Sequence, residues 1–140
     1  MTGFIITGHG SFASGLYSSC KMLIGEFENI EVVDFIENTD LEVLEKQYEE
    51  AISKLQCCGH ILICCDLFGG TPFNQIMMKI AENTDKFTVL AGINLPSLLE
   101  AILKASQGET DRKNYIAQLK EIFSKSLIDG IEMLSNLKEY

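Results

Sequence analysis

The chain lacks an excess of positive charge. Its 11 lysines and arginines stand against 20 aspartates and glutamates, which gives a formal net charge of −9. Because such a surface repels phosphates, this balance argues against non-specific nucleic-acid binding and against attachment to an anionic membrane. We therefore expect no nucleic-acid partner.

The sequence also lacks a long apolar run. None approaches the roughly 18 residues that a membrane-spanning helix needs. The first apolar residues, Phe4 to Thr7, have no basic segment before them. We therefore expect them to form a strand and not a signal peptide.

The spacing typical of a metal site is missing from the cysteines, which are Cys20, Cys57, Cys58, Cys64 and Cys65. Neighbouring residues of a strand point to opposite faces, so Cys64 and Cys65 cannot converge on one metal. Cys57, Cys58 and His60 lie closer together than tetrahedral sites usually require. We expect reduced, buried thiols in a cytoplasmic protein, with no metal and no organic cofactor.

What the chain does contain is an alternation of short apolar segments and amphipathic ones. The apolar segments predict strands at Phe4–Thr7, Ile30–Ile36, His60–Cys65 and Phe87–Ala91. The segments between them repeat apolar residues at helical spacing. This order predicts one domain over residues 1–140, an α/β fold of three layers (α/β/α). The sheet is expected to be mainly parallel, in strand order 2-1-3-4, with helices on both faces. The last ten residues fit either a helix or an extra strand at the edge of the sheet.

Two polar residues follow two of these strands directly. His9, in the turn Gly8-His9-Gly10, comes after the first strand, and Asp66 comes after the third. Ligands of such sheets bind beyond the carboxyl ends of the strands, where the strand order reverses. In the order 2-1-3-4 that point lies between strands one and three. The topology therefore predicts that His9 and Asp66 lie side by side.

An imidazole beside a carboxylate suits phosphoryl transfer. Asp66 would accept a hydrogen bond from one ring nitrogen of His9, which leaves the lone pair of the other facing outward. Donors from two helix starts could stabilise a charged phosphoryl group. These candidate phosphoryl-binding residues are Gly10, Ser11, Gly70 and Thr71. Thr71 is also expected to cap its helix, with Pro72 as the first helical residue.

Other readings of the same residues stay open. His9 is compatible with an ordinary surface turn, and Asp66 with a loop cap. Asn94 either lines the site or shapes its own turn, and His60 has no evident partner in the sequence. A non-catalytic module that binds a phosphorylated ligand or a nucleotide is an alternative, although no complete Gly-x-Gly-x-x-Gly or Walker pattern is present. A hydrolase would need a separate nucleophile, and none is evident.

Three sequence motifs help to distinguish among these alternatives. They are Gly8-His9-Gly10 with Ala13, the segment from Asp66 to Asn74, and Ala91-Gly92-Ile93-Asn94-Leu95-Pro96. Together they resemble the enzyme IIA component of the mannose family of bacterial sugar phosphotransferase systems, from Gly3 to about Leu103.

The resemblance implies a cytoplasmic phosphotransferase that acts through a phosphohistidine. It implies that His9 takes a phosphoryl group from HPr and passes it to enzyme IIB, and that the membrane components IIC and IID are indirect partners. It also implies a homodimer, for which the apolar stripe from Ile116 to Leu134 offers surface. A regulatory relative of the same fold is the remaining alternative. Leu67 and Phe68 depart from the family, whose members often have a small polar residue and a tryptophan there.

Overall fold

The computed structural model describes residues 1–108 and 111–138. Within these residues, the strands β1 (Thr2–His9), β2 (Ile30–Phe35), β3 (His60–Cys65) and β4 (Phe87–Ala91) form one parallel sheet. The strand order is β2-β1-β3-β4, as the sequence predicts. The predicted bounds of β3 and β4 are confirmed, whereas β1 extends further at both ends and β2 stops one residue earlier.

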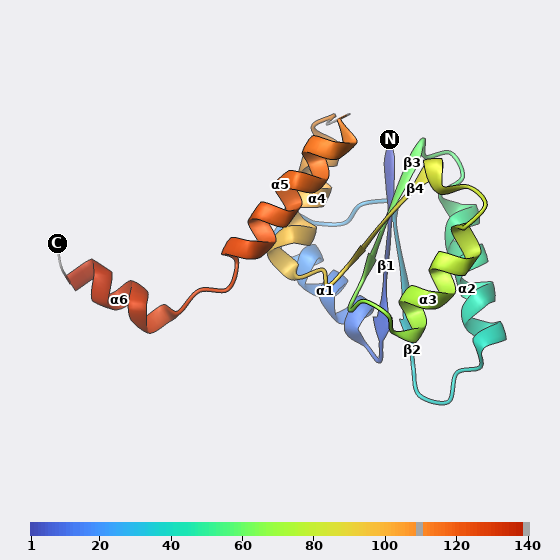
Figure 1. The fold of residues 1–140 in the computed structure, drawn as a ribbon, viewed down its shortest axis with the longest axis horizontal. Helices are drawn as coiled ribbons and strands as arrows, with labels where there is room; N and C mark the ends of the chain where they lie inside the picture. Colours follow the sequence, from blue (N-terminus) through green and yellow to red (C-terminus); the bar gives the residue numbers. More distant parts are fainter. Residues whose placement is uncertain (109–110, 139–140) are drawn as a thin grey trace.

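Helices cover both faces of the sheet (Figure 1). One face carries α1 (Phe12–Ile24), α4 (Leu95–Ser106) and α5 (Arg112–Lys125), whose core residues cluster with Phe4 and Ile6 of β1. The other face carries α2 (Leu41–Lys54) and α3 (Thr71–Ile80), whose core clusters with the alternate residue Ile5. The short helix η1 (Thr84–Lys86) leads into β4. The predicted three-layer α/β/α architecture is therefore confirmed.

The C-terminal segment is a helix and not an additional strand. Helix α6 (Gly130–Lys138) stands apart from the body of the molecule (Figure 1), and none of its described residues is buried. Residues 139 and 140 lie outside the described residues. The apolar stripe predicted from Ile116 to Leu134 divides accordingly, because Leu119 is buried in the core whereas Leu134 is exposed.

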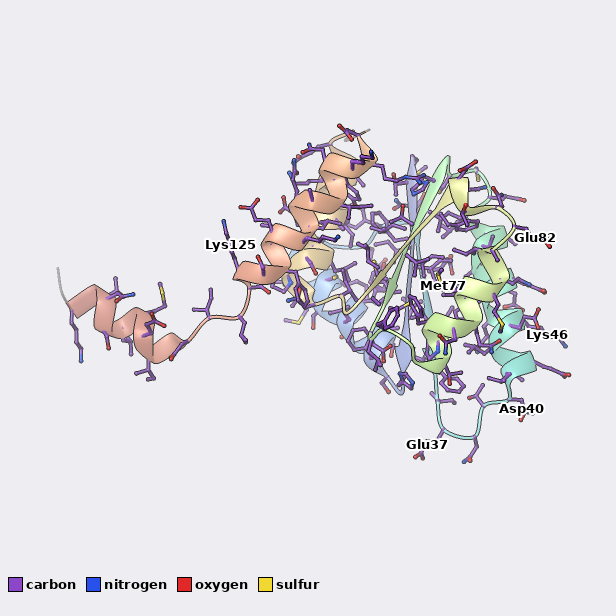
Figure 2. All side chains as sticks on the ribbon, in the orientation of Figure 1. Glu37, Asp40, Lys46, Met77, Glu82 and Lys125 are labelled. Carbon is purple, nitrogen blue, oxygen red and sulfur yellow. The ribbon has the colours of Figure 1, made fainter. Side chains whose placement is uncertain are left out.

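The outer surfaces of the helices carry the charged side chains. Figure 2 shows Lys46 of α2 and Lys125 of α5 pointing away from the sheet. In the part of the chain that the structure describes, no helix combines the length and the apolar character needed to cross a membrane.

Candidate functional site

The carboxyl ends of β1 and β3 bring His9 and Asp66 into contact. The two strands are parallel neighbours in the register Thr7 with Cys65. Asp66 Oδ2 lies 2.7 Å from His9 Nδ1 and also accepts a hydrogen bond from the backbone N–H of His9 at 2.9 Å. The juxtaposition expected from the strand order is therefore confirmed.

The carboxylate fixes which ring nitrogen carries the proton. Burial works to raise the pKa of Asp66, but hydrogen bonds from the backbone and ring of His9 and from the Leu67 N–H outweigh it and hold this pKa below its ordinary value. An ionised carboxylate only accepts hydrogen bonds, so His9 Nδ1 is the protonated nitrogen. The lone pair of Nε2 is left free, on a side chain that is 43% exposed. This arrangement provides an oriented nucleophile.

Two glycines make the close approach possible. A Cβ on Gly8 would lie 2.7 Å from Phe12 Cδ1 and 2.9 Å from Asp66 Cβ. A Cβ on Gly70 would lie 2.6 Å from Cε1 of His9 and 3.3 Å from Nε2. Backbone without a side chain therefore lies against the Cε1–Nε2 edge of the imidazole. Gly10 has a separate reason to be glycine, because its φ is +57°.

The starts of α1 and α3 flank this arrangement. Ser11 is the N-cap of α1 and Gly70 is the N-cap of α3, and neither helix start has a hydrogen bond from an N-cap side chain. The predicted capping role of Thr71 is wrong, because the extended backbone that a cap requires falls one residue earlier, at Gly70. Thr71 is the first helical residue and Pro72 the second. The hydroxyl of Thr71 is therefore not used as the cap of its helix.

Phe35 is a residue of this site that the sequence reasoning missed. Its ring meets the His9 ring edge-on, with centroids 6.0 Å apart, and its carbonyl accepts the Gly10 N–H at 2.8 Å. A signal was present, since strand order 2-1-3 places the last residue of β2 beside His9. On the β3 side, the exposed Phe68 packs against Phe73 with ring centroids 5.0 Å apart.

Asn94 shapes its turn. Its side chain accepts the Ser97 N–H at 3.1 Å in a capping box at the start of α4, and its amide group donates to Ser126 at 2.6 Å. These bonds occupy both ends of the amide. Of the two readings left open by the sequence, the structure supports the one in which Asn94 organises the loop after β4.

His60 lies at the opposite, amino end of β3 and has partners that the sequence did not reveal. Arg112 donates to its Nδ1 at 2.7 Å, so Nε2 carries the proton and donates to Thr88 Oγ1 at 2.8 Å. Burial, and then the Arg112 guanidinium, lower the pKa of His60 below its ordinary value of 6.5. His60 is therefore a structural residue held in its neutral form.

This lowered pKa predicts a loss of stability in mild acid. Below pH 6.5 the unfolded chain binds a proton at His60 that the folded chain does not, so the free energy of unfolding falls as the pH decreases. The urea midpoint of wild type should therefore drop more, from neutral pH to about pH 5.5, than that of His60→Gln, which has no titrating group there. Equal drops in the two proteins would show that His60 contributes nothing to this dependence.

The chain is similar to a group of known proteins. A model of the family described as "PTS system fructose IIA component" matches residues 3–118. The fructose-specific EIIA component of Bacillus subtilis is 36% identical over 102 residues, which cover 73% of this chain and 69% of that protein. The mannose-specific EIIAB component of Escherichia coli is 35% identical over 104 residues, which are 74% of this chain but only 32% of that longer protein.

Among solved structures, the phosphotransferase system component EIIA from Streptococcus agalactiae superimposes with a TM-score of 0.79. It is 29% identical, and the match covers 92% of this chain and 97% of that one. The fold, the family match and the sequence relatives lead to one conclusion. The chain belongs to the family of PTS system fructose IIA components, the EIIA components of the mannose family of sugar phosphotransferase systems.

Proposed function

We propose that this chain is a phosphohistidine carrier in which His9 accepts a phosphoryl group from phospho-HPr and passes it to enzyme IIB. Sugar uptake would follow through the membrane components IIC and IID, in which the sugar specificity mainly resides. The observation that carries the proposal is the 2.7 Å contact of Asp66 with His9 Nδ1, which leaves Nε2 as an exposed nucleophile. Family membership and this exposed nitrogen favour a carrier over a non-catalytic phospho-ligand-binding or regulatory module.

The transfer needs no net change of protons on His9. The Nε2 lone pair forms the new bond to phosphorus, while the bond between phosphorus and the donor atom breaks and leaves its electron pair on the donor. The proton on Nδ1 stays in its hydrogen bond to Asp66. The carboxylate balances the positive charge that develops on the ring. Transfer to enzyme IIB repeats the step in the opposite sense, with His9 as the leaving group.

Donors for the phosphoryl oxygens come from the two helix starts. Backbone N–H groups in a first helical turn lack intrahelical partners and favour anions. We propose that Ser11 at the start of α1 and Gly70 and Thr71 at the start of α3 serve this purpose. Gly10, which the sequence also suggested, does not fit this role, because its backbone N–H already donates to the Phe35 carbonyl at 2.8 Å. Thr71 supports the idea because its hydroxyl is not the cap of α3. With these groups, the transfer would require no metal and no organic cofactor.

The test of the function is incubation with phosphoenolpyruvate, enzyme I and HPr, followed by intact-mass measurement. The protein should gain one phosphoryl group that is lost in acid, and omission of enzyme I should prevent the gain. A protein that stays unmodified while HPr becomes phosphorylated would contradict the carrier function and would leave the regulatory alternative.

Gly70→Ala is expected to slow phosphoryl uptake by roughly ten- to a hundredfold, because the new Cβ must displace the His9 ring. The backbone at Gly70 has φ −74° and ψ 171°, which any residue adopts, so the effect should come from the 2.6 Å overlap with His9 Cε1. Rapid-quench phosphorylation measures it. Gly59→Ala is the matched control, since its Cβ would meet nothing within 4 Å. Equal rates in both variants would mean that the approach of Gly70 to the ring does not matter.

We propose that residues 1–140 form a single enzyme IIA domain that works in the cytoplasm as a homodimer. Helix α6 supports the dimer. Nine residues are too few for a stable isolated helix in water, yet Ile131 and Leu134 are 73% and 54% exposed. A second copy of the chain would cover them.

Light scattering at micromolar concentration should therefore give twice the 15.6 kDa chain mass. The double variant Ile131→Glu/Leu134→Glu should give a monomer, because buried unpaired carboxylates oppose association. A monomeric wild type would contradict the dimer, and a dimeric double variant would exclude α6 as its contact.

A further inference from the structure

One hydroxyl group is buried beneath the proposed site. Tyr48 of α2 is fully buried, and its hydroxyl lies between β1 and α3. It is 2.8 Å from Thr7 Oγ1 and 3.2 Å from the carbonyl oxygen of Pro72. Thr7 is also fully buried. These contacts join segments that are 41 and 24 residues away from Tyr48 in sequence.

The direction of these bonds follows from their partners. The Pro72 carbonyl can only accept, so the Tyr48 O–H donates to it, and the Thr7 O–H in turn donates to the Tyr48 oxygen. Burial, as the largest influence, raises the pKa of Tyr48 above its ordinary value, so that the hydroxyl stays protonated. The three groups therefore satisfy one another in an interior where an unpaired polar group is costly.

The two hydrogen-bond partners of the Tyr48 hydroxyl, Thr7 and Pro72, both lie near the His9 imidazole along the chain or through Gly70. Thr7 precedes His9 by two residues on β1, so its side chain points to the same face of the sheet. Pro72 follows Gly70 by two residues, and Gly70 is the residue whose backbone lies against His9 Cε1 and Nε2. The Tyr48 hydroxyl thus connects the strand that carries the imidazole to the helix start that lies against it.

From this connection we infer that Tyr48 is a positioning residue for phosphoryl transfer. Its hydroxyl sets the distance between β1 and the first turn of α3, and so holds Gly70 and Thr71 in place beside His9 Nε2. The inference rests on the proposed function, in which those two residues contact the phosphoryl group. Tyr48 itself acts from the interior, on the sheet face covered by α2 and α3.

The test compares Tyr48→Phe with Tyr115→Phe. Tyr115 is also buried, and its hydroxyl donates to the Ala101 carbonyl at 2.6 Å, but on the opposite face of the sheet. Both variants lose a buried hydroxyl bonded to a backbone carbonyl, so the urea stability of each should fall. The fall should be larger in Tyr48→Phe, which also leaves the buried Thr7 hydroxyl without its partner. Only Tyr48→Phe should slow phosphorylation, by roughly tenfold in kcat, because small misplacements of reacting groups are costly. Its KM for phospho-HPr should be unchanged, since the outer surface is intact.

A second readout is independent of transfer. The ¹⁵N chemical shifts of the His9 ring should change in Tyr48→Phe and stay as in wild type in Tyr115→Phe. Wild-type kcat in Tyr48→Phe, or slowing of both variants in proportion to their losses of stability, would overturn the inference. If wild type itself takes no phosphoryl group, the proposed function fails, and the ring shifts still decide whether Tyr48 positions the imidazole.

Discussion

His9→Ala is expected to gain no phosphoryl group under conditions that phosphorylate wild type fully. The imidazole supplies the only bond to phosphorus in the proposed mechanism, so its removal should abolish transfer and not merely slow it. The fold should survive, because the side chain is 43% exposed and lies at the end of β1. Intact-mass measurement after incubation with phosphoenolpyruvate, enzyme I and HPr gives the result directly.

His60→Ala is the control for this experiment. It removes the other histidine of the chain, at the amino end of β3, where Arg112 and Thr88 hold it away from the proposed site. This variant should be phosphorylated like wild type. A phosphoryl group that remains on His9→Ala would show that another residue accepts it.

Asp66→Asn is expected to keep the fold and to slow transfer in both directions by about ten- to a thousandfold, or roughly 1.4–4 kcal/mol. Oδ2 of Asp66 accepts two N–H groups of His9, and Oδ1 accepts the Leu67 N–H. An amide has one oxygen, so in either orientation its NH₂ faces a donor. If the NH₂ group faces His9, the imidazole must accept at Nδ1 and carry its proton on Nε2. If the NH₂ group faces Leu67, the Leu67 N–H loses its acceptor. The charge that stabilises the protonated ring is lost in both cases.

Rapid-quench phosphorylation by phospho-HPr and onward transfer to enzyme IIB measure the two directions. Asp34→Asn is the matched control, because Asp34 also accepts a backbone N–H, from Ser14 at 3.0 Å, near the carboxyl end of the neighbouring strand β2. It should transfer at close to the wild-type rate. Wild-type rates in Asp66→Asn would make Asp66 a loop cap with no part in the chemistry.

The fold was predictable because each strand is a short apolar run closed by a turn. Topology alone then placed His9 beside Asp66, since the carboxyl ends of parallel neighbours meet at one edge of the sheet. Phe35 could have been found by the same argument. Tyr48 could not, because in the sequence it is one apolar position of an α2 stripe, and its hydroxyl partners lie far away along the chain.

Sequence patterns were less reliable for the ends of helices and for the C-terminal segment. Thr71 has a good capping side chain, but the extended backbone of the N-cap falls at Gly70, one residue earlier. The sequence did not decide whether the α6 segment is a helix or a strand. Periodicity predicts an element from the side that it buries against the core, and no described residue of α6 is buried in the single chain.

Leu67 and Phe68 give the entrance of the proposed site an apolar character. They are 49% and 78% exposed and directly follow Asp66 in the sequence. Neither side chain offers a hydrogen-bond donor. This agrees with the proposal that the phosphoryl donors come from the starts of α1 and α3.

The most direct test of the central claim is NMR of the phosphorylated protein with ¹⁵N-labelled histidine. We expect a single phosphoryl group bonded to Nε2 of His9, with Nδ1 still protonated in its hydrogen bond to Asp66. A phosphoryl group on Nδ1 or on any other residue, or no phosphoryl uptake by wild type, would contradict it.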